Sequence, residues 1–151
     1  MPKNGSHVMV GSTAGALYSL FLSKDQKAED RFLELIGGGI GGYWGGRLPD
    51  IVEPAPRNPG HRAFAHSLVV GSASYASAKR FASEWARCFR QAADRLALQN
   101  QEQPSSEPDR LLCVALEILL RVAAGMGAGF IAGYVSHLVL DAGTPRSLPL
   151  A

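Results

Sequence analysis

The stretch GGGIGGYWGG, residues 37–46, decides how this chain can fold. Its glycines recur at four-residue spacing, as glycines do at positions 11 and 15 and again at positions 125, 129 and 133. Glycine inside a helix costs about 1 kcal/mol relative to alanine, so a gain elsewhere must offset it. Close approach of helix backbones provides such a gain, in a bilayer or in a tight soluble bundle. The spacing therefore predicts helices that pack through glycine faces.

The rest of the chain also favours an all-α fold. Its apolar segments are long and rich in Gly and Ala, with no period-two alternation and no Asn-Gly or Asp-Gly hairpin signal. The length suits one domain, residues 1–151, and we expect a compact bundle of about five helices. The expected helices are roughly 7–23, 28–46, 61–75, 78–98 and 110–142, of which the third can continue into the fourth. Between the second and third we expect a loop, residues 47–60, because its four prolines exclude a regular helix.

The composition lies between that of a soluble protein and that of a multi-span membrane protein. Hydrophobic residues make up 46% and charged residues 19%, and the mean hydropathy is +0.02. Residues 122–140 carry no Lys, Arg, Asp or Glu and are long enough to span a bilayer. The polar Ser136, His137 and Asp141 at one end fit an active-site helix equally well, so both interpretations stay open. The apolar stretch 8–22 is diluted by Gly and Ser, which favours a buried helix over a signal peptide.

Charge and cysteine content narrow the class of protein further. A net charge of +2 is too small to favour nucleic acid as a partner. Cys88 and Cys113 form no C-x-x-C motif, so a reducing compartment is the simpler assumption. Residues 78–98 predict an amphipathic basic helix, for which an anionic membrane surface is a candidate partner and a solvated face the commoner meaning. The expected apolar side comprises Phe81, Trp85, Phe89 (or Cys88), Ala92 and Leu96, and the basic side Lys79, Arg80, Arg87, Arg90 and Arg95.

The four histidines are His7, His61, His66 and His137, and carboxylates lie beside or among them. Imidazole and carboxylate together form the usual ligand set of a hydrolytic zinc or related metal site. His137 and Asp141 are four residues apart on an expected helix, so they point the same way. A surface histidine–carboxylate pair is the alternative, but an Asp in so apolar a setting is rarely buried without a partner or a ligand.

The proline-rich region and the segment after it supply the other candidates. His61 and His66 are five residues apart, which suits one helical face poorly, so one precedes the helix or they bind different ions. Asp50 follows Leu-Pro, where a stiff backbone can aim its carboxylate; a turn aspartate is the alternative. Glu53 is a ligand or general base, or a solvated loop residue. Arg62 binds a phosphate group or forms a salt bridge with Asp50 or Glu53.

Three short segments carry a resemblance to a known family: GGRLPD (45–50), HRAFAHS (61–67) and GYVSHLVLD (133–141) with Thr144 after it. In this order they resemble the YdjM-like family of bacterial inner-membrane-associated metal-dependent hydrolases, from His7 to about Pro149. That family is distantly similar to zinc-dependent phospholipase C and to zinc-dependent single-strand nucleases, all-helical enzymes that hold zinc ions with His and Asp. The metal ligands that the resemblance implies are His7, Asp50, His61, His66, His137 and Asp141.

The sequence also departs from the family pattern. Val52 stands where the family often has a second acid, and Ala63 and Ala65 stand where it has Gly and Thr. The missing threonine hydroxyl puts a hydrogen bond behind the metal ligands in doubt. The chain stops ten residues after Asp141, before the later membrane helices of some relatives, so we expect a compact, peripheral member.

These patterns lead to the hypothesis of a metal-dependent hydrolase at the bacterial inner membrane or in the cytoplasm. One to three divalent ions, zinc first and manganese as an alternative, would activate water towards a phosphoester. Asp50 or Glu53 would accept the proton, and Arg62 would steady the phosphate. The expected substrate is a small-molecule or lipid phosphoester, nucleic acid is disfavoured, and a second copy of the chain is a candidate partner. The alternative is a non-catalytic, membrane-associated helical protein with a structural metal site.

Overall fold

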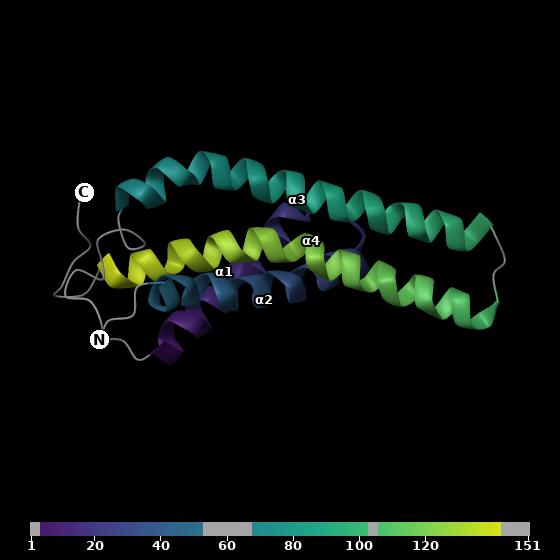
Figure 1. The fold of residues 1–151 in the computed structure, drawn as a ribbon, viewed down its shortest axis with the longest axis horizontal. Helices are drawn as coiled ribbons and strands as arrows, with labels where there is room; N and C mark the ends of the chain where they lie inside the picture. Colours follow the sequence, from purple (N-terminus) through teal and green to yellow (C-terminus); the bar gives the residue numbers. More distant parts are fainter. Residues whose placement is uncertain (1–3, 53–67, 103–105, 143–151) are drawn as a thin grey trace.

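The structure, a computed structural model, describes residues 4–52, 68–102 and 106–142. These residues form four α-helices and no strand: α1 (Asn4–Leu22), α2 (Ala28–Val52), α3 (Leu68–Glu102) and α4 (Glu107–Ala142). The all-α prediction is confirmed. Helices α1, α2 and α4 form a three-helix core, and α3 lies along α4 (Figure 1). About five helices were expected, but in the described ranges residues 68–102 form the single helix α3. Nothing in their sequence breaks the helix near residue 77.

Glycine faces hold the three core helices together, as their spacing predicts. A Cβ atom placed on Gly11 of α1 would lie 2.7 Å from the carbonyl oxygen of Gly42 in α2. One placed on Gly15 would lie 2.8 Å from the Gly42 Cα, and one on Gly129 of α4 would lie 2.6 Å from the Gly38 Cα. Real Cβ atoms do not approach other atoms so closely. Only glycine therefore permits this packing, in which backbone touches backbone.

The expected loop at residues 47–60 is wrong in its first part, because α2 continues to Val52 with Pro49 inside it. Proline cannot donate an N–H to the carbonyl four residues earlier, and its ring crowds that carbonyl. Here that carbonyl belongs to Gly45, which has no side chain of its own, and Pro49 is buried against the neighbouring helices. Packing with those helices makes a proline tolerable in such a helix. Residues 53–60, with the other three prolines, lie outside the described residues.

Helix α3 packs on α4 with a face that only partly matches the expected apolar side, which included both Phe81 and Trp85. Phe81 was assigned to the apolar side but is 55% exposed. The indole N–H of Trp85 donates to the Ala123 carbonyl of α4 at 2.7 Å, and its ring lies against Gly127. Small side chains let the two helices approach, which a stripe of large aromatic residues would not. Among residues 77–102 of α3, the buried positions are Ala82, Ala86 and Ala93.

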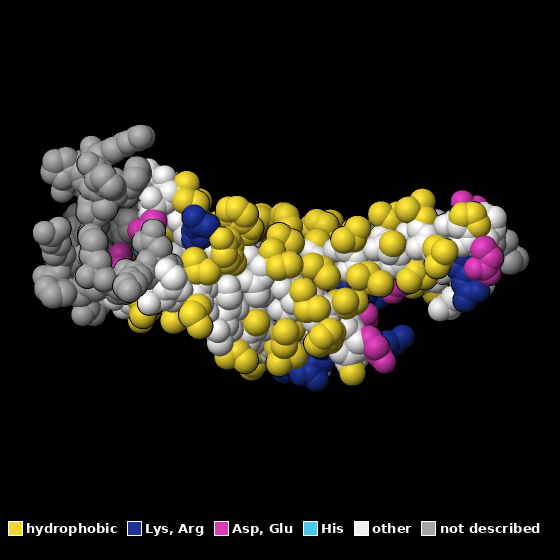
Figure 2. All heavy atoms as spheres, turned by 90° about the horizontal axis from the view of Figure 1, so that it is seen from below, with side chains coloured by type: hydrophobic (Ala, Val, Ile, Leu, Met, Phe, Trp, Pro, Cys, Tyr) yellow, Lys and Arg dark blue, Asp and Glu magenta, His cyan; other side chains and the backbone are white. Residues whose placement is uncertain are grey.

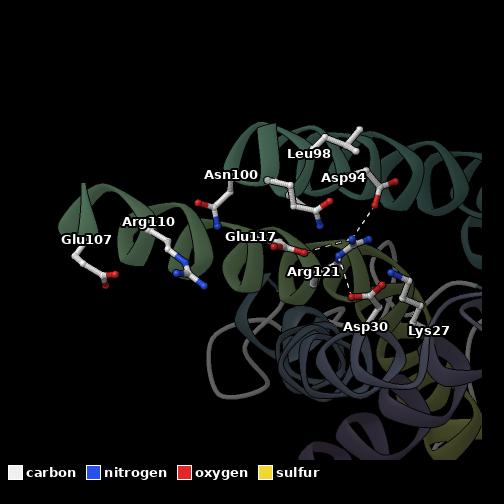
Figure 3. A pocket seen from close by; sticks show the side chains of 11 residues that line it. Lys27, Asp30, Asp94, Leu98, Asn100, Glu107, Arg110, Glu117 and Arg121 are labelled. Atoms are coloured by element: carbon white, nitrogen blue, oxygen red, sulfur yellow. Dashed lines mark hydrogen bonds and ion pairs between the residues drawn. The ribbon is translucent and has the colours of Figure 1, made fainter. Parts of the chain in front are cut away.

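Two groups of ion pairs join α3 to the core. Glu34 of α2 is 1% exposed, and both of its carboxylate oxygens accept hydrogen bonds from Arg90 at 2.6 Å. Arg90 was expected on the basic surface and instead turns inward. Arg121 of α4 is buried and reaches Asp30 of α2 at 3.1 Å and Asp94 of α3 at 2.7 Å (Figure 3). With Glu117, 3.6 Å from Arg121, these six residues are named the arginine cluster.

The outer faces of the core helices are apolar. Hydrophobic side chains cover most of the described surface seen in Figure 2, and the charged groups lie mainly on the right of the view and beside the grey residues on the left. Helix α4 is long and apolar enough to cross a membrane, by length and composition. A bilayer would cover such a surface without the cost of exposing it to water. The most exposed of these side chains include Met9, Leu17, Phe21, Phe32, Trp44 and Val139.

Candidate metal centre

The glycine faces end in polar residues at one end of the core, and the four-residue steps continue through them. On α1, His7 lies four residues before Gly11. On α2, Asp50 lies four residues after Gly46. On α4, His137 and then Asp141 continue the steps of Gly125, Gly129 and Gly133. Residues at this spacing share one helix face, so the three helices must bring these side chains together where their glycine contacts end.

The four side chains are separated by distances suited to a shared ion. His137 Nε2 lies 3.5 Å from Asp141 Oδ2 and 3.8 Å from Asp50 Oδ1, and His7 Nε2 lies 3.7 Å from Asp141 Oδ1. These separations exceed the roughly 3.2 Å limit of a good hydrogen bond. Ligand atoms around a tetrahedral zinc ion, each about 2.0 Å from it, are about 3.3 Å apart. His7, His137 and Asp141 can bring one ligand atom each within 4.8 Å of the others.

Burial distinguishes three of these residues from the fourth. His7 and Asp141 are each 4% exposed and His137 is fully buried, whereas the side chain of Asp50 is 42% exposed. The rings of His7 and His137 lie with their centroids 4.2 Å apart. Polar groups gathered in an apolar interior are costly unless hydrogen bonds or ion coordination compensate them. Asp50 marks the side of the cluster that is open to solvent.

The two imidazoles are presented in different ways. Nδ1 of His137 lies 2.8 Å from the Gly46 carbonyl, which can only accept, so this nitrogen carries the proton and donates. In a neutral imidazole Nε2 would then carry the lone pair, and this atom lies on the side of the two carboxylates; a backbone contact of this kind is usual behind a metal-binding histidine. His7 Nδ1 is buried and has no hydrogen-bond partner among the described residues. A buried nitrogen in that state fits coordination of an ion.

Four of the six predicted ligands therefore come together: His7, Asp50, His137 and Asp141. The remaining two, His61 and His66, lie outside the described residues, as do the predicted catalytic residues Glu53 and Arg62. The role of the Gly46 carbonyl was not predicted. Its signal in the sequence is position, because Gly46 is the last glycine of the α2 face before Asp50.

A second polar region, at the arginine cluster, forms a cavity of about 970 Å³ between the start of α4, the end of α3 and the start of α2 (Figure 3). Neither His nor Cys is among the side chains that line it. Lys27 and Arg110 line it together with Asp30, Asp94 and Glu117, so charges of both signs face one another. This set resembles a structural ion-pair network more than a metal site.

Comparison with known protein families identifies the chain. The family model described as YdjM inner membrane protein matches residues 1–151. The chain belongs to this family. A search of the curated proteins and a search of the solved structures found no match. Of the two locations expected from the sequence, the inner membrane and the cytoplasm, the family supports the inner membrane, and α4 is long and apolar enough to cross it.

Proposed function

We propose that this member of the YdjM family is a metal-dependent hydrolase of phosphoesters. The observation that carries the proposal is the spacing of His7, His137 and Asp141: Asp141 lies 3.7 Å from His7 and 3.5 Å from His137, and one ligand atom of each residue lies within 4.8 Å of the others, close enough to share an ion. Imidazole and carboxylate donors favour zinc, with manganese as the alternative. The three helices that hold these residues pack through backbone contacts, which leaves the donor atoms little freedom to move.

His7, His137 and Asp141 would hold the ion. The Gly46 carbonyl would keep His137 in the tautomer whose Nε2 can coordinate. His61 and His66 are the candidates for completing this set or for holding a further ion. When bound, a divalent ion supplies Lewis-acid activation of water near neutral pH and stabilises charge on a phosphoryl group.

Asp50 would act as the general base; the support for this role is its partly exposed carboxylate, which lies 3.8 Å from His137 Nε2. It would accept a proton from the attacking water, whose oxygen forms a bond to phosphorus. The phosphorus–oxygen bond of the ester breaks, and the leaving oxygen departs with the electron pair and takes up a proton as the alcohol. No oxidant or reductant is required. Arg62 remains the candidate for steadying the phosphate, and Glu53 the alternative base.

The burial of three ligands favours a second candidate function. A closed site in which every ligand comes from the protein would be a structural metal site. Its ion would hold the helix ends together without catalysis. His7, His137 and Asp141 match that description, whereas Asp50 with its 42% exposure favours an open, catalytic position. The two functions differ in turnover and share metal binding.

The first test is the metal content of the purified full chain, measured by elemental mass spectrometry in detergent micelles. We expect at least one equivalent of zinc or manganese in the wild type and its loss in His137→Ala and Asp141→Ala. Asp25→Ala is the matched control, since it removes an exposed carboxylate in the turn between α1 and α2. A metal-free wild type, or equal metal in all variants, would refute the proposal.

The second test separates hydrolysis from a structural role. Bis(p-nitrophenyl) phosphate, a water-soluble diester, is given to the zinc-loaded protein, and release of nitrophenol is followed. We expect turnover in the wild type and a loss of about 100-fold in Asp50→Asn at unchanged zinc content, the size usual for a general base. Bound metal without any turnover in the wild type would leave the structural site as the function.

A further inference from the structure

A shallow groove of about 460 Å³ runs between α1 and α4 on the outside of the core. Its lining carries no charged residue, and its polar groups belong to Tyr18 and Ser136 alone. The Ser136 hydroxyl donates to the Gly133 carbonyl of its own helix at 2.7 Å. The groove therefore presents an almost wholly apolar surface. The other side chains that line it are Val10, Ala14, Ile131, Ala132, Val135, Val139 and Leu140.

The groove follows the helix axes and ends beside the candidate metal centre. Its α1 residues recur in four-residue steps from Val10 to Tyr18, a rise of about 12 Å along the helix. Its α4 residues cover the same face from Ile131 to Leu140. His7 precedes Val10 by less than one turn, and Asp141 directly follows Leu140. A molecule extended in the groove would thus have one end beside the helix turns that carry His7 and Asp141, although the side chains of both residues are buried and do not line the groove.

The membrane location of the protein indicates which molecules meet the groove. The chain is an inner membrane protein, and the side chains beside the groove are strongly exposed, with Met9 73%, Leu17 60% and Val139 66% accessible. Acyl chains are the molecules that such a surface meets in a bilayer. An acyl chain in a bilayer is as apolar as the lining, so van der Waals packing would hold it in the groove, whereas a charged head group would find no partner along the lining.

We infer that the groove binds one acyl chain of a membrane phospholipid and places its phosphoester head group at His7, His137 and Asp141. This inference rests on the proposed function for the chemistry, and it names the substrate class: a phospholipid of the surrounding bilayer, not a water-soluble phosphodiester. The substrate would reach the site sideways along α1 and α4. The apolar groove would then select lipids by their chain, and the His and Asp residues would act on the head group.

The direct test is photolabelling of the full chain in nanodiscs of phosphatidylethanolamine and phosphatidylglycerol. A small fraction of phosphatidylglycerol carries a diazirine in one acyl chain, and labelled residues are mapped by mass spectrometry. We expect labels to concentrate on residues 10–18 and 131–140. The exposed leucines at 111, 112 and 119 of α4 serve as the internal control, because they are equally apolar and lie far along the helix from the groove. Equal labelling of both regions would overturn the inference.

A variant that fills the groove sharpens the test. Ala132→Phe places a ring in the groove, and Ala115→Phe adds the same ring to an exposed position of α4 outside it. The ring would remove van der Waals contacts between an acyl chain and the lining, and a tenfold loss of binding corresponds to losing about 1.4 kcal/mol of them. We expect groove labelling and phosphatidylglycerol hydrolysis to fall about tenfold in Ala132→Phe alone, with zinc content and bis(p-nitrophenyl) phosphate turnover unchanged. Equal lipid hydrolysis in both variants would overturn the inference.

The two proposals fail in different ways. If zinc binding and turnover of the soluble diester hold while groove labelling fails, the acyl site is wrong and the hydrolase stands. If the groove is labelled in a wild type that binds no metal, the hydrolase is wrong and the acyl site stands without its chemistry. Labelling of the wild type does not depend on the folding of any variant.

Discussion

The two groups of polar side chains in the core differ in the distances between their charged atoms. In the arginine cluster, Arg90 meets both oxygens of Glu34 at 2.6 Å, and Arg121 meets Asp94 at 2.7 Å. In the candidate metal centre, the imidazole nitrogens and carboxylate oxygens are 3.5 to 3.8 Å apart. Charge-assisted hydrogen bonds lie near 2.7 to 2.9 Å. The arginine cluster thus combines short charge-assisted hydrogen bonds with the longer Glu117–Arg121 contact of 3.6 Å, whereas all three His–Asp separations in the candidate metal centre are longer than such bonds and would accommodate an ion.

Both groups of polar side chains can fix the register of the three core helices. Backbones that touch through glycine leave little apolar side chain to fix the register of the helices. Specific polar contacts at both ends of the glycine faces can fix it instead, and they tie down α1, α2 and α4 at one end and α2, α3 and α4 at the other. One end would depend on metal and the other would not. Substitutions in either group of side chains test this difference.

The largest effect is expected for Glu34→Ala. The substitution leaves the Arg90 guanidinium, with a side chain only 20% exposed, without its carboxylate partner. Breaking a pair of this kind costs about 3 kcal/mol of unfolding free energy. The measurement is unfolding by SDS in mixed micelles, followed by helical circular dichroism. Glu84→Ala, which removes an exposed carboxylate of α3, should change stability by no more than about 0.5 kcal/mol. Equal loss in both variants would contradict a special role for the Glu34–Arg90 pair.

At the candidate metal centre, we expect added zinc to raise the unfolding free energy. At a free zinc concentration of 100 times the dissociation constant, binding to the folded state adds about 2.7 kcal/mol to the unfolding free energy. Asp141→Ala should lose this increment and gain little from added zinc, whereas Glu34→Ala should keep it on its lower baseline. A zinc increment of the same size in Asp141→Ala would show that the ion binds elsewhere. The same unfolding measurement with chelator and with buffered zinc provides the test.

The sequence predicted the helical class and the glycine contacts because both depend on local spacing. Glycines at 11, 15, 38 and 42 repeat every four residues, and that period is enough to define a face. The same step leads from Gly133 to His137 and Asp141, so this pair was predictable. The candidate ligands on α1 and α2, His7 and Asp50, were predicted from composition and family resemblance. The packing of the three helices brings them close to the pair on α4.

The predictions for Pro49 and Arg90 were wrong because contacts between helices outweigh the local preferences of these residues. Pro49 stays inside α2 because neighbouring helices pack around it, which no local rule for proline contains. Arg90 looks like its basic neighbours on the helical wheel, and only the position of Glu34 in another helix turns it inward. The partnership of Arg90 and Glu34 spans 56 residues of sequence and has no local signal.

A smaller loss of unfolding free energy is expected for Trp85→Phe. This variant tests how far uncharged contacts, in addition to the ion pairs, hold α3 on the core. The variant keeps an aromatic ring against Gly127 but loses the indole hydrogen bond to the Ala123 carbonyl. Loss of such a bond costs about 1 kcal/mol. SDS unfolding should show this loss with the zinc increment unchanged. A cost as large as that of Glu34→Ala would mean that the indole, not the ion pair, fixes α3 to the core.

The smallest effect is expected for Arg87→Ala, and the matched comparison is Arg90→Ala. Both residues belong to α3 and were expected on one basic surface, but Arg87 is exposed and Arg90 binds a buried carboxylate. Arg87→Ala should change the unfolding free energy by no more than about 0.5 kcal/mol, whereas Arg90→Ala strands Glu34 and should cost about 3 kcal/mol. The two are compared in micelles with and without phosphatidylglycerol. If Arg87→Ala becomes destabilising only with the anionic lipid, α3 contacts the membrane surface through its outer face. If it remains neutral in both, that face is solvated, and α3 is held by the residues that it turns inward.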